Sequence, residues 1–299
     1  MHYYHLFNWT IQSELKLSEL NKIEPIQKVD IKIELTSAES FNINSSEKGI
    51  AYQLNSNQFL FEVDHIAKYF IKNLSEIHIS IVSGADLNEV KFHFYNSVIG
   101  ALCYLRGTLP IHAASIVKGE KTCLLAGGAG AGKSTLAGGL CQNGGSLLSD
   151  DLSPVFFDKH TPKIAQGIPI LKLWPDSIKK LNIKLEQKRK IRSSINKQLC
   201  LMKPSNANER VMLSKMFVLK PTISLEEITV EKLHGRKKLN VVLEQVYRNQ
   251  LSREFGLQRE NYMRCCLLAK NIEVYLINQP RKLNRFKQQV NLVLSLLEE

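Results

Sequence analysis

Short runs of alternating hydrophobic and polar residues mark the first hundred residues of the chain. Residues 29–35, Val-Asp-Ile-Lys-Ile-Glu-Leu, alternate strictly, which is the period of a β-strand with one buried face. Residues 58–63 and 77–82 are further strand candidates because they are rich in Ile, Val and Phe. The pattern therefore predicts a small β-rich domain over residues 1–100.

The hydrophobic period changes after this region. Residues 92–105 are mostly apolar without strict alternation, and they end at Arg106-Gly107, a typical helix end. Beyond them, short apolar segments alternate with helical patterns, an order typical of an α/β fold. We therefore predict a second domain over residues 101–299, with a mixed or parallel central sheet and flanking helices.

The second region opens with a strand, a glycine-rich turn and a helix. The strand is predicted over residues 122–126, the helix over 133–142, and a second strand over 146–149, ending on two aspartates. Later elements are predicted as strands at 155–157, 212–219 and 228–230, and as helices at 237–248, 259–270 and 283–297.

Composition adds few constraints. The chain has 299 residues, 44% hydrophobic and 23% charged, which is ordinary for a globular protein. Its longest apolar run, residues 97–105, is about half as long as a membrane-spanning helix. The N-terminus lacks a basic and a hydrophobic signal region, and the six cysteines lack metal-binding spacing. We therefore expect a cytoplasmic protein with free thiols and no transmembrane segment.

The formal net charge of +12 is distributed unevenly. Residues 1–150 hold 12 Lys and Arg against 14 Asp and Glu, a net −2, whereas residues 151–299 hold 28 against 14, a net +14. The basic residues are densest between Lys179 and Lys197. Such a concentration indicates an anionic partner, such as nucleotide phosphates, an acidic peptide, nucleic acid or a membrane surface, or else a solvated loop.

A phosphate-binding motif occupies residues 127–135, which match the pattern G-x-x-x-x-G-K-[ST]. Such a loop turns consecutive N–H groups toward one phosphate, and the helix that follows adds its positive N-terminal end. We expect Lys133 to reach the β- and γ-phosphates of ATP and the Ser134 hydroxyl to ligate Mg²⁺. The expected nucleotide-binding residues are Gly127, Gly128, Ala129, Gly130, Ala131, Gly132, Lys133, Ser134 and Thr135.

Asp150 and Asp151 follow the strand predicted at 146–149. The carboxyl ends of parallel strands meet at one sheet edge, so we expect both carboxylates beside the phosphate loop. One of them suits Mg²⁺ and the other suits the proton of an attacking hydroxyl, whereas a helix cap or a turn is the structural alternative. His112 is either a packed, hydrogen-bonded residue or a group that orients a carboxylate or a phosphate.

Segments 106–115, 127–135 and 147–151 together resemble the catalytic domain of HPr kinase/phosphorylase. They are more similar to its shorter relatives, the HPr-kinase-like serine kinases found with lasso-peptide biosynthesis enzymes. The resemblance departs at Lys163 and Gln166, which stand where the signature of HPr kinase has Glu and Arg. This departure, together with a different N-terminal region, disfavours HPr itself as the substrate.

The resemblance implies a P-loop kinase domain, self-association and a division of roles within the site. Asp150 would accept the proton of the substrate hydroxyl, and His112 would steady that carboxylate. Ser134 and Asp151 would hold Mg²⁺, and Lys133 would contact the phosphates. The fold class expected from the resemblance is an α/β domain of the HPr kinase type, preceded by the β-rich domain.

We therefore expect an ATP-dependent kinase that phosphorylates a serine of a peptide or protein, with a ribosomally made precursor peptide and an acidic substrate as candidates. Arg192, Arg210 and Arg236 are candidates for stabilising the transferring phosphoryl group. The alternatives are a small-molecule or nucleic-acid kinase and a nonenzymatic nucleotide-binding regulator. A nucleic-acid partner is disfavoured because no aromatic-rich strand interleaves with the basic residues.

Overall fold

A computed structural model describes most of the chain. The described residues are 1–37, 41, 43, 47–49, 51–183, 190–192, 195–202, 209–223, 225–280 and 285–299, with backbone only at 47, 48, 190–192 and 195. They divide into two compact units, Met1–Pro110 with Arg248–Asn261, and Ile111–Tyr247 with Tyr262–Glu299.

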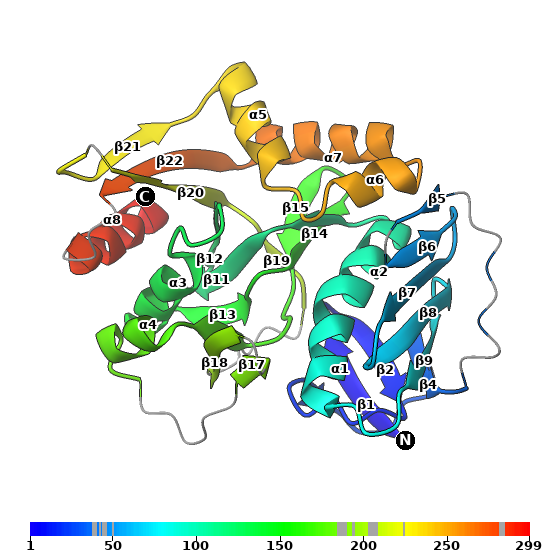
Figure 1. The fold of residues 1–299 in the computed structure, drawn as a ribbon. Helices are drawn as coiled ribbons and strands as arrows, with labels where there is room; N and C mark the ends of the chain where they lie inside the picture. The colour runs from blue at the N-terminus through cyan, green and yellow to red at the C-terminus, as the bar shows by residue number, and fades with distance from the viewer. Residues whose placement is uncertain are drawn as a thin grey trace. The chain divides into compact units, whose positions relative to one another are not determined.

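The first unit is built on a nine-stranded sheet with the order β3-β1-β2-β4-β9-β8-β7-β6-β5 (Figure 1). Its strands are β1 (His2–Leu6), β2 (Trp9–Ser13), β3 (Asn21–Lys22), β4 (Ile31–Leu35), β5 (Glu47–Lys48), β6 (Tyr52–Leu54), β7 (Phe59–Val63), β8 (Ala67–Asn73) and β9 (Glu76–Ile81). The alternation predicted for β4 is confirmed at Ile31 and Ile33, which are buried with an exposed residue between them, whereas the apolar Leu35 at the end of the strand is exposed.

The helices of the first unit are α1 (Leu87–His93), a π-helical turn (Phe94–Val98), α2 (Ile99–Leu105) and α6 (Gln250–Glu254). The Asp86 side chain caps α1 by accepting a hydrogen bond from the backbone of Asn88. The Tyr69 hydroxyl of β8 donates to the Val90 carbonyl of α1 over 2.8 Å. The helical segment therefore belongs with this sheet, and the units divide after Pro110 rather than near residue 100. In addition, the first unit contains residues 248–261.

The second unit begins within β10 (Leu109–Ile111). Its strands are β11 (Ala113–Lys118), β12 (Lys121–Gly127), β13 (Ser146–Ser149), β14 (Ser153–Asp158), β15 (Thr161–Ile164), β16 (Ile170–Leu173), β17 (Lys190–Arg192), β18 (Ile195–Leu201), β19 (Val211–Met212), β20 (Lys215–Thr222), β21 (Thr229–Lys232) and β22 (Glu273–Pro280). Its helices are α3 (Lys133–Gln142), α4 (Pro175–Lys180), α5 (Gly235–Glu244), most of α7 (Gln258–Asn271), and α8 (Phe286–Glu298).

The central sheet of the second unit has the order β13-β11-β12-β20-β22-β21. Strands β12, β20 and β22 are parallel, whereas β11 is antiparallel to both of its neighbours, β12 and β13. The sheet is therefore mixed, and the prediction of a mixed α/β architecture is confirmed. Because β12 and β13 run in the same direction, their carboxyl ends lie at the same edge of the sheet.

Helices α3 and α8 pack together against this sheet (Figure 1). Gly139 of α3 permits the close approach, since a Cβ there would lie 2.7 Å from Cγ2 of Val290. Leu136 and Leu140 of α3 join Val293 of α8 in the buried core. This packing fixes the direction of α3 and thereby the position of the loop at its N-terminus.

Candidate active site

The phosphate loop connects the end of β12 to the start of α3. Gly127, Gly130 and Gly132 have φ values of 132°, 76° and 95°, which favour glycine. A Cβ at Gly127 would lie 2.4 Å from the Leu219 carbonyl oxygen of β20, so no side chain fits there. The predicted loop residues thus form a tight turn whose backbone conformation depends on glycine.

Lys133 closes over this loop and is buried. Its ammonium group donates to the carbonyl oxygens of Gly127 and Gly128 over 2.7 and 3.3 Å, and it lies 3.2 Å from Nε2 of His112. Burial lowers the pKa of Lys133, and the nearby aspartates oppose this shift. All three contacts are to neutral groups, which an anionic phosphate can replace.

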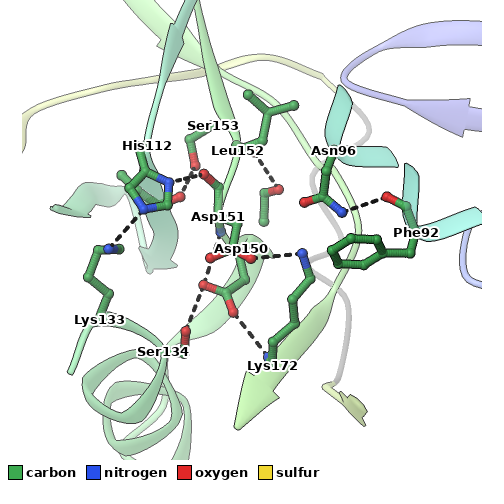
Figure 2. A network of polar contacts seen from close by, with 12 residues as sticks. Phe92, Asn96, His112, Lys133, Ser134, Asp150, Asp151, Leu152, Ser153 and Lys172 are labelled. Atoms are coloured by element: carbon green, nitrogen blue, oxygen red, sulfur yellow. Dashed lines mark hydrogen bonds and ion pairs between the residues drawn. The ribbon is translucent and has the colours of Figure 1, made fainter. Parts of the chain in front are cut away.

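Asp150 lies directly after β13 and is buried (Figure 2). Its Oδ1 accepts hydrogen bonds from the Ser134 hydroxyl over 3.1 Å and from its neighbour's backbone N–H over 3.0 Å. Its Oδ2 accepts from the backbone N–H of Lys172 over 3.1 Å. Burial and the adjacent Asp151 carboxylate raise the pKa of Asp150 to about 6.

Asp151 occupies a left-handed backbone conformation with φ 68°, which is uncommon for residues other than glycine. Its Oδ2 accepts a hydrogen bond from the ammonium group of Lys172 over 2.7 Å. Burial alone would raise the pKa of Asp151, but Lys172 and then His112 outweigh burial and lower this pKa to about 2. The pKa values of the two adjacent carboxyl groups are therefore shifted in opposite directions.

His112 connects the two parts of the site. Its Nδ1 lies 2.9 Å from the Asp151 carbonyl oxygen, and burial together with Lys133 lowers its pKa. A carbonyl oxygen only accepts hydrogen bonds, so a neutral His112 donates from Nδ1 and accepts at Nε2 from Lys133. The sequence predicted that His112 steadies the Asp150 carboxylate, whereas this contact is with the backbone of Asp151.

Two residues of the cluster, Lys172 and Gln245, were missed by the sequence analysis. Lys172 lies between two buried leucines of β16, so the strand period alone places it on the opposite face of that strand. The Gln245 side-chain oxygen accepts a hydrogen bond from the Gly127 backbone N–H over 2.9 Å. The Gln245 backbone carbonyl accepts a second one from the His112 backbone N–H over 2.7 Å. No sequence signal marks Gln245, because it follows α5, far along the chain.

Other predicted residues have roles outside this cluster or cannot be placed. The Thr135 hydroxyl lies 2.9 Å from that of Ser177, and the Arg210 guanidinium stacks 3.8 Å from the ring centroid of Phe156. Arg236 is exposed at the start of α5. The Arg192 side chain and residues 184–189 of the basic segment lie outside the described residues.

Gln166, one of the two residues that differ from the HPr kinase signature, forms a hydrogen bond with β13, the strand that leads to the aspartates. Its side-chain amide donates to the Leu148 carbonyl oxygen over 2.9 Å, and the next backbone N–H, that of Gly167, donates to the same oxygen over 2.8 Å. Lys163 pairs with Asp158 over 3.0 Å on the surface. Both residues thus have structural contacts.

A cavity of about 380 Å³ adjoins the loop. It is lined by loop residues, the ends of β20 and β22, and the start of α8. Its walls outside the loop are formed by Thr135, Pro221, Ile228, Gln279, Pro280, Arg285, Phe286 and Gln289. Gln279 ties β22 to the loop by donating to the Ala131 carbonyl oxygen over 2.7 Å. The volume lies in the range of small-ligand sites.

Comparisons with known proteins add little. No protein-family model and no curated protein matches the sequence. Among solved structures, the chain is similar to the Hpr(Ser) kinase/phosphatase from Coxiella burnetii, with 14% identity and a TM-score of 0.32, over 62% of this chain and 94% of that chain. At this level the similarity carries no argument about function. Among the described helices, none is both long and apolar enough to cross a membrane.

Proposed function

We propose that this chain is an ATP-dependent kinase that transfers the γ-phosphoryl group to a serine hydroxyl of a peptide or protein. The observation that carries this proposal is the single cluster that joins Lys133 and Ser134 to Asp150, Asp151 and His112 (Figure 2). A phosphate loop, a hydroxyl for Mg²⁺ and a pair of carboxylates are the groups that phosphoryl transfer requires.

The loop fits the triphosphate of ATP. A Cβ added at Gly128 or Gly130 would meet nothing within 4 Å, so the space beside the backbone is open. Lys133 exchanges its two carbonyl contacts for the β- and γ-phosphates, and that exchange is favourable because hydrogen bonds between ions are stronger than those to neutral oxygens.

The site also fits Mg²⁺. Ser134 Oγ and Asp150 Oδ1 are hard oxygen ligands only 3.1 Å apart. Among the described residues, no cluster of three or more His, Cys, Asp and Glu side chains could hold a metal ion. This sparse donor set suits Mg²⁺, which binds one or two protein oxygens together with phosphates and water. Bound there, the ion would neutralise charge on the phosphates.

In the proposed reaction, the two carboxylates have different roles, one toward Mg²⁺ and one toward the acceptor hydroxyl. One carboxylate joins Ser134 at the metal, and the other takes the proton of the acceptor hydroxyl. The resemblance to HPr-kinase-like kinases assigns the metal to Asp151 and the proton to Asp150. The neutral His112 forms hydrogen bonds with both the Asp151 backbone and Lys133, and it thereby holds the two carboxylates beside the phosphate loop.

The adjoining cavity accommodates the nucleoside part of ATP. The Phe286 side chain offers an aromatic surface for the base, and Gln289 and Arg285 offer polar groups. Phe286→Ala should weaken ATP binding about 5- to 10-fold because stacking contributes about 1 kcal/mol. Inorganic tripolyphosphate, which has no base, should bind the variant and the wild type equally. Equal loss of both ligands would contradict a nucleoside site here.

Serine as acceptor is supported by the resemblance of segments 106–115, 127–135 and 147–151 to HPr-kinase-like serine kinases. To test it, the purified chain is incubated with Mg²⁺, labelled ATP and a library of serine-containing peptides of varied charge. Mass spectrometry should find phosphoserine, and Lys133→Ala should abolish it. Nucleotide binding without any labelled acceptor would favour the nonenzymatic regulator, and labelled RNA or small molecules would favour the other kinase classes.

A further inference from the structure

Lys172 contacts both carboxylates of the candidate site. Its backbone N–H donates to Asp150 Oδ2 over 3.1 Å, and its ammonium group donates to Asp151 Oδ2 over 2.7 Å (Figure 2). No other residue of the described chain donates a side-chain hydrogen bond to the Asp151 carboxylate. A single position on β16 thus holds the pair together.

The ion pair between Lys172 and Asp151 is largely buried. Their side chains retain 16% and 23% of their exposure, so solvent screens this pair less than a surface pair. The flanking residues Leu171 and Leu173 are buried in the core and fix the orientation of β16. His112 and Lys197 also act electrostatically on Asp151, but Lys172 is the cation in direct contact.

The two carboxylates differ in the partners already present. Asp150 accepts from Ser134, the loop hydroxyl that would ligate Mg²⁺, and it is buried with 7% exposure. Asp151 already carries an ammonium group, and a divalent ion beside that ammonium would be repelled. Asp151 is also the more exposed of the two, so an acceptor side chain reaches it more easily.

We propose that Lys172 is a positioning residue, a resident cation that neutralises Asp151 and thereby leaves the metal to Asp150 and Ser134. This inference rests on the proposed kinase function, and it exchanges the two roles expected from the sequence. In the transfer step, the serine Oγ forms the new bond to the γ-phosphorus. The bond from that phosphorus to the bridging oxygen breaks, and its electron pair stays on ADP. The new bond to phosphorus makes the serine proton strongly acidic, so it then passes to Asp151 even though this carboxylate is paired with Lys172.

Metal binding in the ADP complex tests this division without any turnover. Mn²⁺ replaces Mg²⁺ as a paramagnetic probe, and its affinity is measured by electron paramagnetic resonance. Asp150→Asn should weaken Mn²⁺ binding by about 10- to 100-fold because a metal ligand is lost. Asp151→Asn should weaken it by only about 3- to 10-fold, because it removes one nearby negative charge and no ligand. Asp158→Asn, at an exposed carboxylate outside the site, is the matched control. Equal weakening by the two site variants would overturn the proposal.

Substitution of Lys172 tests the cation directly. Lys172→Met removes the charge and should tighten Mn²⁺ binding by about 3- to 10-fold, because one nearby positive charge is lost. Lys172→Arg keeps the charge and should preserve the wild-type affinity. The double variant Lys172→Met/Asp151→Asn leaves no unpaired charge, so it should fold and return to near the wild-type affinity. Unchanged Mn²⁺ affinity in folded Lys172→Met would show that the resident cation does not act on the metal site.

The outcomes separate this inference from the proposed function. A wild-type chain that binds neither ADP nor Mn²⁺·ADP would overturn the kinase proposal and the role of Lys172 with it. A wild-type chain that transfers phosphoryl groups, but whose two aspartate variants lose Mn²⁺ equally, would overturn only the role of Lys172.

Discussion

The phosphate loop holds the buried Lys133 and the carboxylate pair holds the half-buried Lys172, but the partners of the two lysines differ in charge. Lys133 contacts two backbone carbonyl groups and a histidine whose pKa is lowered. Lys172 contacts an ionised carboxylate. Because a hydrogen bond between ions is about twice as strong as one with a neutral partner, Lys133 can exchange partners and Lys172 stays in place. One lysine therefore serves the incoming ligand and the other serves the architecture of the site.

Loss of the exchangeable lysine should have the largest effect on function. Lys133→Ala removes the charge aimed at the phosphates, so ATP affinity should fall by about 10- to 100-fold. Turnover should fall by about 10³-fold or more, since transfer depends on electrostatic stabilisation of the phosphoryl group. Calorimetry with Mg²⁺·ATP measures the affinity, and Lys121→Ala, at the exposed start of β12, is the control. Equal ATP affinity in wild type and variant would remove the loop from the site.

Asp151, the partner of the fixed lysine, should come next. Asp151→Asn keeps the shape of the side chain but removes the proton acceptor, so kcat should fall by about 10²- to 10⁴-fold. Nucleotide affinity should change little, because the phosphates contact the loop. Steady-state kinetics with a phosphorylated peptide as product provides the measurement. Full turnover in Asp151→Asn, together with its loss in Asp150→Asn, would restore the roles expected from the sequence.

The same contrast explains what the sequence could predict. The loop from Gly127 to Lys133 is predictable because consecutive residues and their own backbone conformations form it. Two further elements, one in each unit, match the residue pattern: β4 alternates at Ile31–Ile33, and α3 has the predicted bounds Lys133–Gln142. By contrast, the contact of Lys172 with Asp151 joins residues that are distant along the chain, and no period specifies that pairing. The division of the units after Pro110 was missed for a similar reason, since long-range packing decides it.

The two carboxylates should have opposite effects on stability. The pKa of Asp150 is raised from 3.8 to about 6, so its favourable contribution is present below pH 3.8 and is lost as pH rises through 6. The pKa of Asp151 is lowered to about 2, so its contribution is present above pH 3.8 and is lost as pH falls through 2. At pH 7, ionised Asp150 therefore destabilises the metal-free protein and ionised Asp151 stabilises it.

Denaturant unfolding at pH 7 and pH 4.5 measures this difference. At pH 7, Asp150→Asn should raise the free energy of unfolding by about 1–3 kcal/mol, because it removes a buried negative charge that lies beside a second carboxylate. Asp151→Asn should lower it by about 1–3 kcal/mol, because Lys172 loses its partner. The gain in Asp150→Asn should shrink at pH 4.5. Changes of the same sign in both variants would contradict the electrostatic contrast between the two carboxylates.

The smallest expected effect concerns Lys197, a residue of the basic segment whose side chain is described. Its ammonium group lies 5.5 Å from the ring centroid of the half-exposed Trp174, and its charge lowers the pKa of Asp151 and of Lys133. Lys197 thus adds positive potential to the site without holding any of its groups. Such a charge guides an acidic peptide toward the site and does not take part in transfer.

Lys197→Gln should therefore raise the KM for an acidic peptide by about 2- to 5-fold, the range of a solvent-screened pair, and leave kcat unchanged. The KM of the wild type should rise with added salt more steeply than that of the variant. Lys220→Gln, at an exposed position of β20, should behave as the wild type. A fall in kcat of tenfold or more in Lys197→Gln would instead place this ammonium group at the transferring phosphoryl group, where it would act as a third lysine of the catalytic cluster.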